Sequence, residues 1–273
     1  MRMNRRAALL WSSGVLLPGR WGSDGDDPET RDFLGIGDQG DQEDSEMGGR
    51  DLEEYIRATP DEKRRKRNFA FAMEHEMVQY EIEVAAEKRR VFSDHIRAED
   101  RVVEVGLGTG PNLWYYPSGV KVLGIEPNRY MDSYAIEKAN QLDLLSLEIY
   151  RGSIEQTAPE LQGKFDVAVS TLTLCSVHDP VLAVRNIAAM LKSGGKFIFL
   201  EHVVSTNPVL EKFQTICDPL QARFSDGCSL TRRTGDIIEH ESSFRMLEMK
   251  RFRLKDLGAI LISPHILGVA RKV

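Results

Sequence analysis

Residues 102 to 110 read VVEVGLGTG, and this stretch decides the fold of the chain. An apolar run that leads into three alternate glycines, Gly106, Gly108 and Gly110, predicts a buried strand that turns sharply into a helix. Glycines at such a turn let a ligand contact the backbone directly, because no side chain stands in the way. The turn is therefore predicted to bind a nucleoside cofactor.

The spacing of the glycines separates two classes of cofactor. A dinucleotide pattern G-x-G-x-x-G that begins at Gly106 requires glycine at position 111, where the chain has Pro111. The pattern present is E-x-G-x-G-x-G, and a second apolar run, from 120 to 125, ends on Glu126, whose carboxylate can accept both hydroxyls of a ribose. Together these features resemble the first two motifs of class I methyltransferases that use S-adenosylmethionine (SAM), so SAM is favoured over NAD and FAD. A tight turn without a ligand is the alternative for the glycines alone.

Length and charge indicate one catalytic domain with an N-terminal appendage. The 273 residues are 41% hydrophobic, which is enough for a substantial core. The formal net charge of -6 arises from residues 22 to 54, which contain thirteen acidic residues and two arginines. Residues 22 to 51 are predicted to be an acidic disordered linker, because their few apolar side chains cannot offset the entropy of ordering. An acidic arm that binds a partner is the alternative.

Residues 1 to 21 are predicted to be a targeting segment. Three arginines precede an apolar run from 7 to 17, which is shorter than the roughly 20 residues that span a bilayer. The adjacent arginines resemble a twin-arginine signal, as in the second half of a thylakoid transit sequence. Chloroplast localisation is therefore expected, with peripheral membrane association or a chance leader on a cytoplasmic protein as alternatives.

Two further features exclude other classes of protein. The three cysteines, Cys175, Cys217 and Cys228, form no C-x-x-C pair, so neither a disulfide framework nor a metal site is predicted, and a reducing compartment is favoured. Residues 52 to 97 are predicted to be an N-terminal helical segment that lies over the cofactor cleft. Its basic run, 63 to 67, is more typical of a solvated helix face than of a nucleic-acid site.

Residues 98 to 273 alternate between strand and helix patterns. Repeated β-then-α units predict an α/β fold of the Rossmann-like class I methyltransferase type, a mostly parallel seven-stranded sheet with helices on both faces. The strands are expected at 101–105, 120–125, 146–150, 165–171, 195–201, 244–253 and 265–272, and the helices at 111–116, 128–143, 153–161 and 180–192.

Loops that follow the parallel strands are predicted to hold the cofactor, because the carboxyl ends of such strands meet at one edge of the sheet. The glycine turn and the helix that begins at Pro111 would contact the methionine end of SAM. Glu104 is expected to face its ammonium group and Glu126 its ribose. Pro127 and Asn128 are expected to flank the adenine.

Three later residues complete the predicted cofactor contacts. Ser153 would bond the edge of the adenine and Ile154 would cover its face, while Thr171 ends the fourth predicted strand. An equally weighted alternative for Ser153 is an ordinary helix N-cap, with Gln156 three residues later in a capping-box pattern.

Four segments carry a closer resemblance. The chain from about Val91 to Lys272 resembles the thiol S-methyltransferase family, known as methyltransferase-like 7, within the type 11 methyltransferases; the quinone-biosynthesis methyltransferases are more distantly similar. The N-terminal region departs from the membrane-anchoring helix of the animal members. The four segments are TLTLCSV (171–177), GGKFIFLEHV (194–203), DGCSLTR (226–232) and PHILGVA (264–270).

This resemblance implies SAM-dependent methylation of a small molecule, with the sulfur of an alkyl thiol as the expected acceptor. The alternatives are a quinone-type carbon or oxygen methyltransferase and, in another class, a non-catalytic SAM-binding protein. A thiol needs no strong base, since its pKa is about 8.5. If a base acts, His202 is the first candidate and His178 the second, because either can titrate near neutrality. Asp218 and Asp226 are candidate orienting groups, and Cys175 and Cys228 are expected to be buried packing residues.

Overall fold

The computed structural model describes residues 57–142, 146–157, 159–255 and 260–273. The predicted targeting segment (1–21) and acidic linker (22–51) lie outside these residues, as do the first five residues of the helical segment 52–97. Within the described ranges, none of the helices combines the length and apolar character needed to cross a bilayer.

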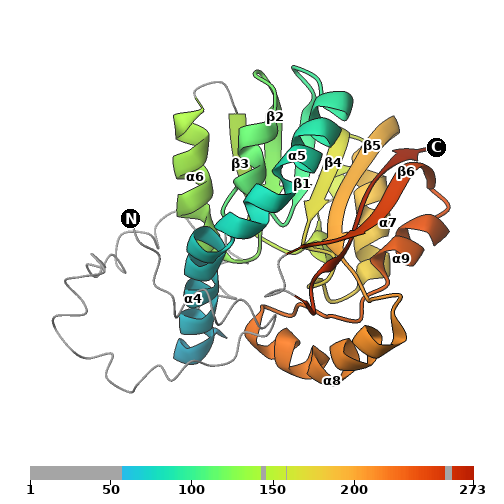
Figure 1. The fold of residues 1–273 in the computed structure, drawn as a ribbon. Coiled ribbons are helices and arrows are strands. Elements are labelled where there is room, and N and C mark those ends of the chain that lie inside the picture. The colour runs from blue at the N-terminus through green and yellow to red at the C-terminus, as the bar shows by residue number, and fades with distance from the viewer. Residues whose placement is uncertain (1–56, 143–145, 158, 256–259) are drawn as a thin grey trace.

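A single sheet of seven strands forms the centre of the molecule (Figure 1). The strand order is β3-β2-β1-β4-β5-β7-β6; the first five strands in this order are parallel to one another, and β7 is antiparallel to both β5 and β6. The predicted mostly parallel seven-stranded sheet is confirmed. The strands are β1 (Arg101–Val105), β2 (Lys121–Ile125), β3 (Ser146–Tyr150), β4 (Phe165–Thr171), β5 (Leu191–His202), β6 (Phe244–Arg253) and β7 (Pro264–Lys272).

Helices pack on both faces of the sheet (Figure 1). The α-helices are α4 (Pro60–Glu76), α5 (Val78–His95), α6 (Asp132–Gln141), α7 (Pro180–Met190), α8 (Pro208–Phe224) and α9 (Thr234–His240), and the 3₁₀ helices are η2 (Pro111–Tyr115), η3 (Arg129–Met131), η4 (Ile154–Gln156) and η5 (Pro159–Leu161). Successive residues of β1 point to opposite faces of the sheet. Val102 packs in the hydrophobic cluster that includes α5 and α6, and Val103 packs in the cluster that includes α7 and α9.

The structure corrects two of the predicted helices. The helix predicted at 153–161 is wrong: the described residues there form only the short η4 and η5, because Pro159 has no backbone N–H to continue a helix. The segment that begins at Pro111 is a five-residue 3₁₀ helix in place of an α-helix. Strand β5 also begins at Leu191, directly after α7, and is longer than the predicted 195–201.

Helix α5 is built into the core, whereas α4 is mostly exposed. Tyr80, Val84, Lys88, Val91 and Phe92 of α5 are buried, but Ala70 is the one buried residue of α4. The N-terminus of α4 is capped reciprocally, since Thr59 and Glu62 each accept a hydrogen bond from the backbone N–H of the other.

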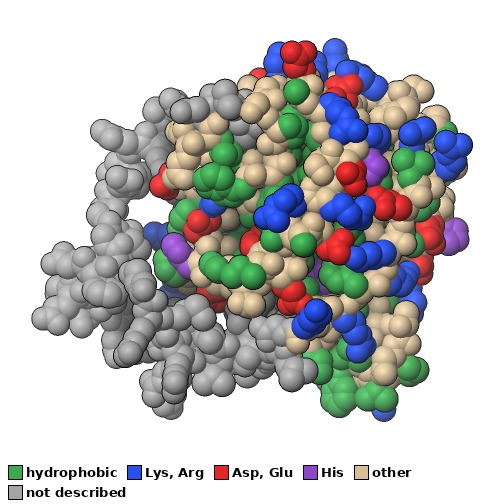
Figure 2. All heavy atoms as spheres, turned by 45° about the horizontal axis from the view of Figure 1, so that its top comes forward, with side chains coloured by type: hydrophobic (Ala, Val, Ile, Leu, Met, Phe, Trp, Pro, Cys, Tyr) green, Lys and Arg blue, Asp and Glu red, His purple; other side chains and the backbone are tan. Residues whose placement is uncertain are grey.

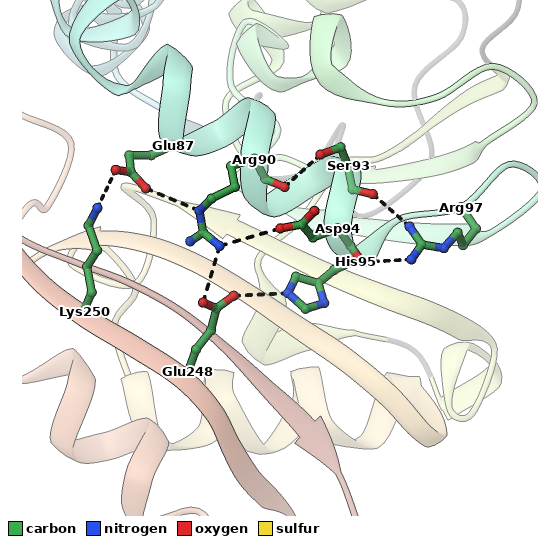
Figure 3. A network of polar contacts seen from close by, with 8 residues as sticks. All are labelled: Glu87, Arg90, Ser93, Asp94, His95, Arg97, Glu248 and Lys250. Atoms are coloured by element: carbon green, nitrogen blue, oxygen red, sulfur yellow. Dashed lines mark hydrogen bonds and ion pairs between the residues drawn. The ribbon is translucent and has the colours of Figure 1, made fainter.

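Ion pairs join the exposed side of α5 to β6 (Figure 3). Glu248 of β6 contacts Arg90 at 3.4 Å and His95 at 3.1 Å, while Lys250 of the same strand pairs with Glu87. Exposed pairs of this kind each stabilise a protein by less than about 1 kcal/mol. The buried side chains of α5 therefore contribute most to holding this helix on the sheet, and the ion pairs help to orient it against β6.

Charged side chains of both signs are interspersed on the face of the molecule in Figure 2. Ion pairs also join separate elements of the fold, among them Lys138 of α6 with Glu74 of α4 and Arg151 with Asp132. The pair of Lys138 and Glu74, together with a hydrogen bond from Asn128 Nδ2 to the carbonyl of Lys66, holds α4 beside the loop that follows β2.

Gly268 of β7 lies where the sheet has no room for a side chain. A Cβ there would lie 2.4 Å from Phe199 Cζ and 2.7 Å from the carbonyl oxygen of Glu248. We expect Gly268→Ala to lower the free energy of unfolding by about 2 kcal/mol through overpacking, measured by urea denaturation. Gly235→Ala in α9 is the control, because the nearest atom to its added Cβ is Nη2 at the flexible end of Arg251, 3.3 Å away. Equal losses in the two variants would contradict the packing explanation.

Candidate cofactor and acceptor site

The glycine turn after β1 has one open position. All three glycines have positive φ, at 70° for Gly106, 57° for Gly108 and 76° for Gly110, a region that side chains disfavour. A Cβ on Gly106 would lie 2.0 Å from Thr173 Oγ1, and one on Gly110 would lie 2.8 Å from Leu113 Cδ1. The nearest atom to a Cβ on Gly108 is 4.0 Å away. The outer two glycines are therefore required for packing, and Gly108 leaves space in which a ligand can reach the backbone.

Glu126 lies beside this open position. One of its carboxylate oxygens accepts a hydrogen bond from the N–H of Gly108 and the other from the N–H of Asn128, both at 2.8 Å. Burial raises the pKa of Glu126 to about 7, although the two amide donors act to lower it. A carboxylate has about four acceptor positions. The remaining ones suit the two hydroxyls of a ribose, so the residues present fit a nucleoside cofactor.

Glu104 is the centre of a buried network on the other side of the turn. Its oxygens accept hydrogen bonds from Asn112 Nδ2 at 2.8 Å and from the Tyr116 hydroxyl at 2.6 Å. Burial raises the pKa of Glu104 to about 7, against the lowering effect of these donors and of buried Lys88. Asn112 also donates to Thr171 Oγ1 at 3.1 Å, so Thr171 at the end of β4 joins the same network.

The residues predicted to surround the adenine have varied environments. Pro127 is exposed, but Asn128 is buried and its side-chain oxygen accepts from the N–H of Tyr130 at 3.2 Å. Ser153 is the N-cap residue of η4, as the alternative expected, but its side chain makes no capping hydrogen bond, so the capping-box pattern with Gln156 does not form. Ile154 is buried among residues of the sheet face that α7 covers.

The two candidate bases lie in different surroundings. His178 is exposed in the loop before α7, where its backbone N–H donates to Glu155 at 2.8 Å. His202 is buried at the end of β5, and its Nε2 lies 3.0 Å from Cys228 Sγ. Burial acts to lower the pKa of His202, but Cys175 and Glu201 act to raise it and the net shift is upward.

Cys175 completes a cluster with His202 and Cys228 that sequence reasoning missed. One ligand atom from each of the three buried residues lies within 4.8 Å of those of the other two. Cys175 and Cys228 are buried, as expected, but their contact with His202 is not predicted, because the three residues come from the loop after β4, the end of β5 and the loop after α8 and no motif links them. Cys217, on α8, is half-buried and is not part of the cluster.

Of the two remaining candidate acids, Asp218 has a structural part. Asp218 of α8 accepts hydrogen bonds from the hydroxyl of Ser229 at 3.0 Å and from the N–H of Leu230 at 2.5 Å, so it shapes the loop that carries Cys228. Asp226 is exposed in the same loop and has a φ of 47°.

The strand order, the glycine turn and the acid after β2 define a class I methyltransferase. The family model described as a methyltransferase domain matches residues 103–199. The fold is shared with YcgJ from Bacillus subtilis, with a TM-score of 0.53 and 15% identity over 68% of this chain and 98% of that one. Geranyl diphosphate methyltransferase, solved in complex with SAM, gives a TM-score of 0.52 and 14% identity over 68% of this chain and 85% of that one.

Similarity to two human proteins identifies the family of methyltransferases more closely. The human thiol S-methyltransferase TMT1A is 31% identical over 214 residues, which cover 76% of this chain and 87% of that protein. Human TMT1B is 31% identical over 173 residues, covering 63% of this chain and 70% of that protein. The chain belongs to this family of methyltransferases, and it is a SAM-dependent enzyme that methylates a small molecule.

The raised pKa of Glu104 predicts a pH-dependent cost in stability. Its pKa rises from 4.5 to about 7 on folding, so the folded state holds the proton more tightly and stability falls as pH rises between these values. We expect Glu104→Gln to raise the free energy of unfolding by up to about 3 kcal/mol at about pH 8.5 and to change it little at about pH 5.

Urea denaturation at the two pH values measures this difference. Glu137→Gln on the exposed side of α6 is the matched control and should behave like the wild type at both. An equal effect of Glu104→Gln at both pH values would sink the prediction, because the charge of Glu104 would then carry no cost.

Proposed function

We propose that the methyl acceptor is the sulfur of a small alkyl thiol. The observation that carries this proposal is the similarity to human TMT1A over 76% of the chain, because that protein is named a thiol S-methyltransferase. The structure adds support. Each of the four segments that carry the family resemblance supplies one residue to a connected group at the ends of β4, β5 and β7: Cys175, His202, Cys228 and His265.

The chemistry of a thiol acceptor suits this site. SAM brings an activated sulfonium, so the protein needs chiefly to align the acceptor sulfur, the methyl carbon and the leaving sulfur. A thiol with a pKa of about 8.5 is partly ionised near neutrality. Strong general-base catalysis is therefore unnecessary, and a buried cluster of side chains with few charges can form the binding site of the acceptor.

A methyl-transfer assay tests the acceptor. With SAM labelled on its methyl group, we expect label to appear on 1-propanethiol and not on 1-propanol, because the alcohol is far less acidic and its oxygen is a harder nucleophile. A quinol is the third acceptor in the panel. Transfer to the quinol with none to a range of alkyl thiols would contradict the proposal and favour a quinone-type methyltransferase.

We propose that the loops after β1, β2, β3 and β4 bind SAM. In this arrangement Glu126 accepts the ribose hydroxyls and the open backbone at Gly108 admits the methionine portion. Pro127 and Asn128 flank the adenine, with Ser153 at its edge and Ile154 beneath it. Glu104 and Thr171, linked by Asn112, then form the wall nearest the amino group of SAM.

The pKa of Glu126 predicts that SAM affinity depends on pH. The ionised carboxylate accepts hydroxyl donors better than the protonated one, and the pKa of Glu126 is about 7 before SAM binds. The dissociation constant should therefore be about tenfold higher at about pH 6 than at about pH 8. Calorimetric titration with SAM at the two pH values measures this change.

Glu126→Gln separates this residue from other titrating groups. The variant should bind SAM more weakly at about pH 8 and should lose most of the pH dependence, because it carries no ionisable group at the ribose. Glu137→Gln, far more exposed, should retain the wild-type profile. An unchanged affinity in Glu126→Gln would mean that other residues hold the ribose.

A further inference from the structure

We propose that Cys175, His202 and Cys228 form a zinc site beside the cofactor turn. Two thiol sulfurs and an imidazole nitrogen approach one another within 4.8 Å, and all three side chains are buried, with exposed fractions of 1%, 3% and 9%. They come from the loop after β4, the end of β5 and the loop after α8. Three potential ligands that converge from three separate elements indicate a site that the fold assembles.

The distances suit tetrahedral coordination. Zinc–sulfur bonds of about 2.3 Å separate neighbouring ligands of a tetrahedral site by about 3.8 Å. His202 Nε2 and Cys228 Sγ are 3.0 Å apart, which is shorter than this value, and no two of the three ligand atoms are more than 4.8 Å apart. Movements of about 1 Å would therefore let the three atoms surround one ion.

The loops that carry the ligands are tied to one another. The carbonyl of Cys175 accepts hydrogen bonds from the N–H of Ser229 at 3.0 Å and from Arg232 at 3.3 Å, which joins the loop after β4 to the loop after α8. Glu201, next to His202, accepts from the N–H groups of Thr173 at 3.3 Å and Leu174 at 3.2 Å. The ligands are thus held in place before an ion binds, which lowers the cost of ordering the site.

His202 gives independent evidence for a missing partner. Its Nδ1 is buried and has no hydrogen-bond partner among the residues that the structure describes. Buried polar atoms in native proteins are nearly always satisfied, and exceptions commonly mark a water or an ion that belongs there. The two ring nitrogens point in different directions, so an ion on Nε2 would leave Nδ1 to donate to a separate water, which would orient the ring.

The ligand set favours zinc and leaves one position open. Thiolates select soft or borderline cations over magnesium and calcium. Structural zinc sites have four protein ligands, whereas two cysteines with one histidine and an open fourth position are typical of catalytic zinc. The loop with Cys175 also packs on the glycine turn, since Thr173 fills the space beside Gly106. The proposed site therefore stands beside the glycine turn, and its open position is where we place the methyl acceptor.

If the acceptor is a thiol, as proposed above, its sulfur is the natural fourth ligand. The thiol would lose its proton to solvent and bind zinc as a thiolate, which keeps a lone pair for attack on the methyl carbon. The new sulfur–carbon bond then forms as the carbon–sulfonium bond of SAM breaks, and that bonding pair stays on the sulfur of S-adenosylhomocysteine. The neutral thioether product is a poorer zinc ligand than the thiolate and leaves. In this arrangement His202 is a ligand and not the base.

Metal content tests the site without any substrate. The full chain is purified with a phosphine reductant and zinc present. After gel filtration it is expected to retain about one zinc ion per molecule, measured by inductively coupled plasma mass spectrometry. Cys175→Ser, Cys228→Ser and His202→Ala should each lower this value severalfold. Cys217→Ser is the matched control and should retain zinc. Absence of bound zinc in the wild type would overturn the proposal.

Cobalt substitution and alkylation test the wild type directly, in case the variants fail to fold. Replacement of zinc by Co²⁺ should produce a thiolate-to-cobalt charge-transfer band, which shifts when 1-propanethiol is added. Zinc should also protect Cys175 and Cys228, but not Cys217, from iodoacetamide. No cobalt band with no zinc protection would overturn the site, as would a Cys175–Cys228 disulfide as the stable form of the purified protein.

These readouts separate the zinc site from the proposed function. Bound zinc without transfer to any thiol would leave the metal site intact and contradict the thiol acceptor. Methylation of 1-propanethiol by metal-free protein, at the same rate as by zinc-loaded protein, would support the thiol acceptor and overturn the catalytic part of the zinc proposal.

Discussion

Thr173 occupies the space that any side chain at position 106 would need, and this contact joins the two halves of the site. Its side chain lies against the glycine turn after β1, and its backbone N–H donates to Glu201 near the end of β5. The first, fourth and fifth strands therefore end in one packed unit. If SAM binds at the glycine turn, as proposed above, such packing would hold its methyl group at a constant distance from the loop after β4, and constant geometry is the main requirement for direct methyl transfer.

Local patterns predicted the centre of the sheet because strands β1, β2 and β4 are short, rich in apolar residues and mostly buried. Valines at 102 and 103 pack in opposite clusters, which explains why β1 reads as a continuous apolar run and not as an alternating one. Prediction failed where a weak pattern met a local constraint. The stretch 153–161 has helical composition, yet Pro159 limits it to isolated 3₁₀ turns.

The proposed cofactor side and acceptor side of the site also differ in how far they can be predicted from the sequence. The glycine turn and Glu126 can be recognised from sequence because each follows a strand and has a fixed spacing. The group of Cys175, His202 and Cys228 has no such spacing, since its members meet only after the sheet and α8 have assembled. Three of the four family-like segments did contain its residues, so the resemblance indicated which loops matter but not that they touch.

The difference in burial between the two N-terminal helices has a consequence for how this region can diverge. Five side chains of α5 are buried and its exposed side is paired with β6, whereas α4 buries only Ala70. Substitutions should therefore accumulate easily before Met77 and rarely after it. The two helices of this segment should therefore differ in how freely they tolerate substitution, because changes in α4 disturb few buried contacts and changes in α5 disturb the core.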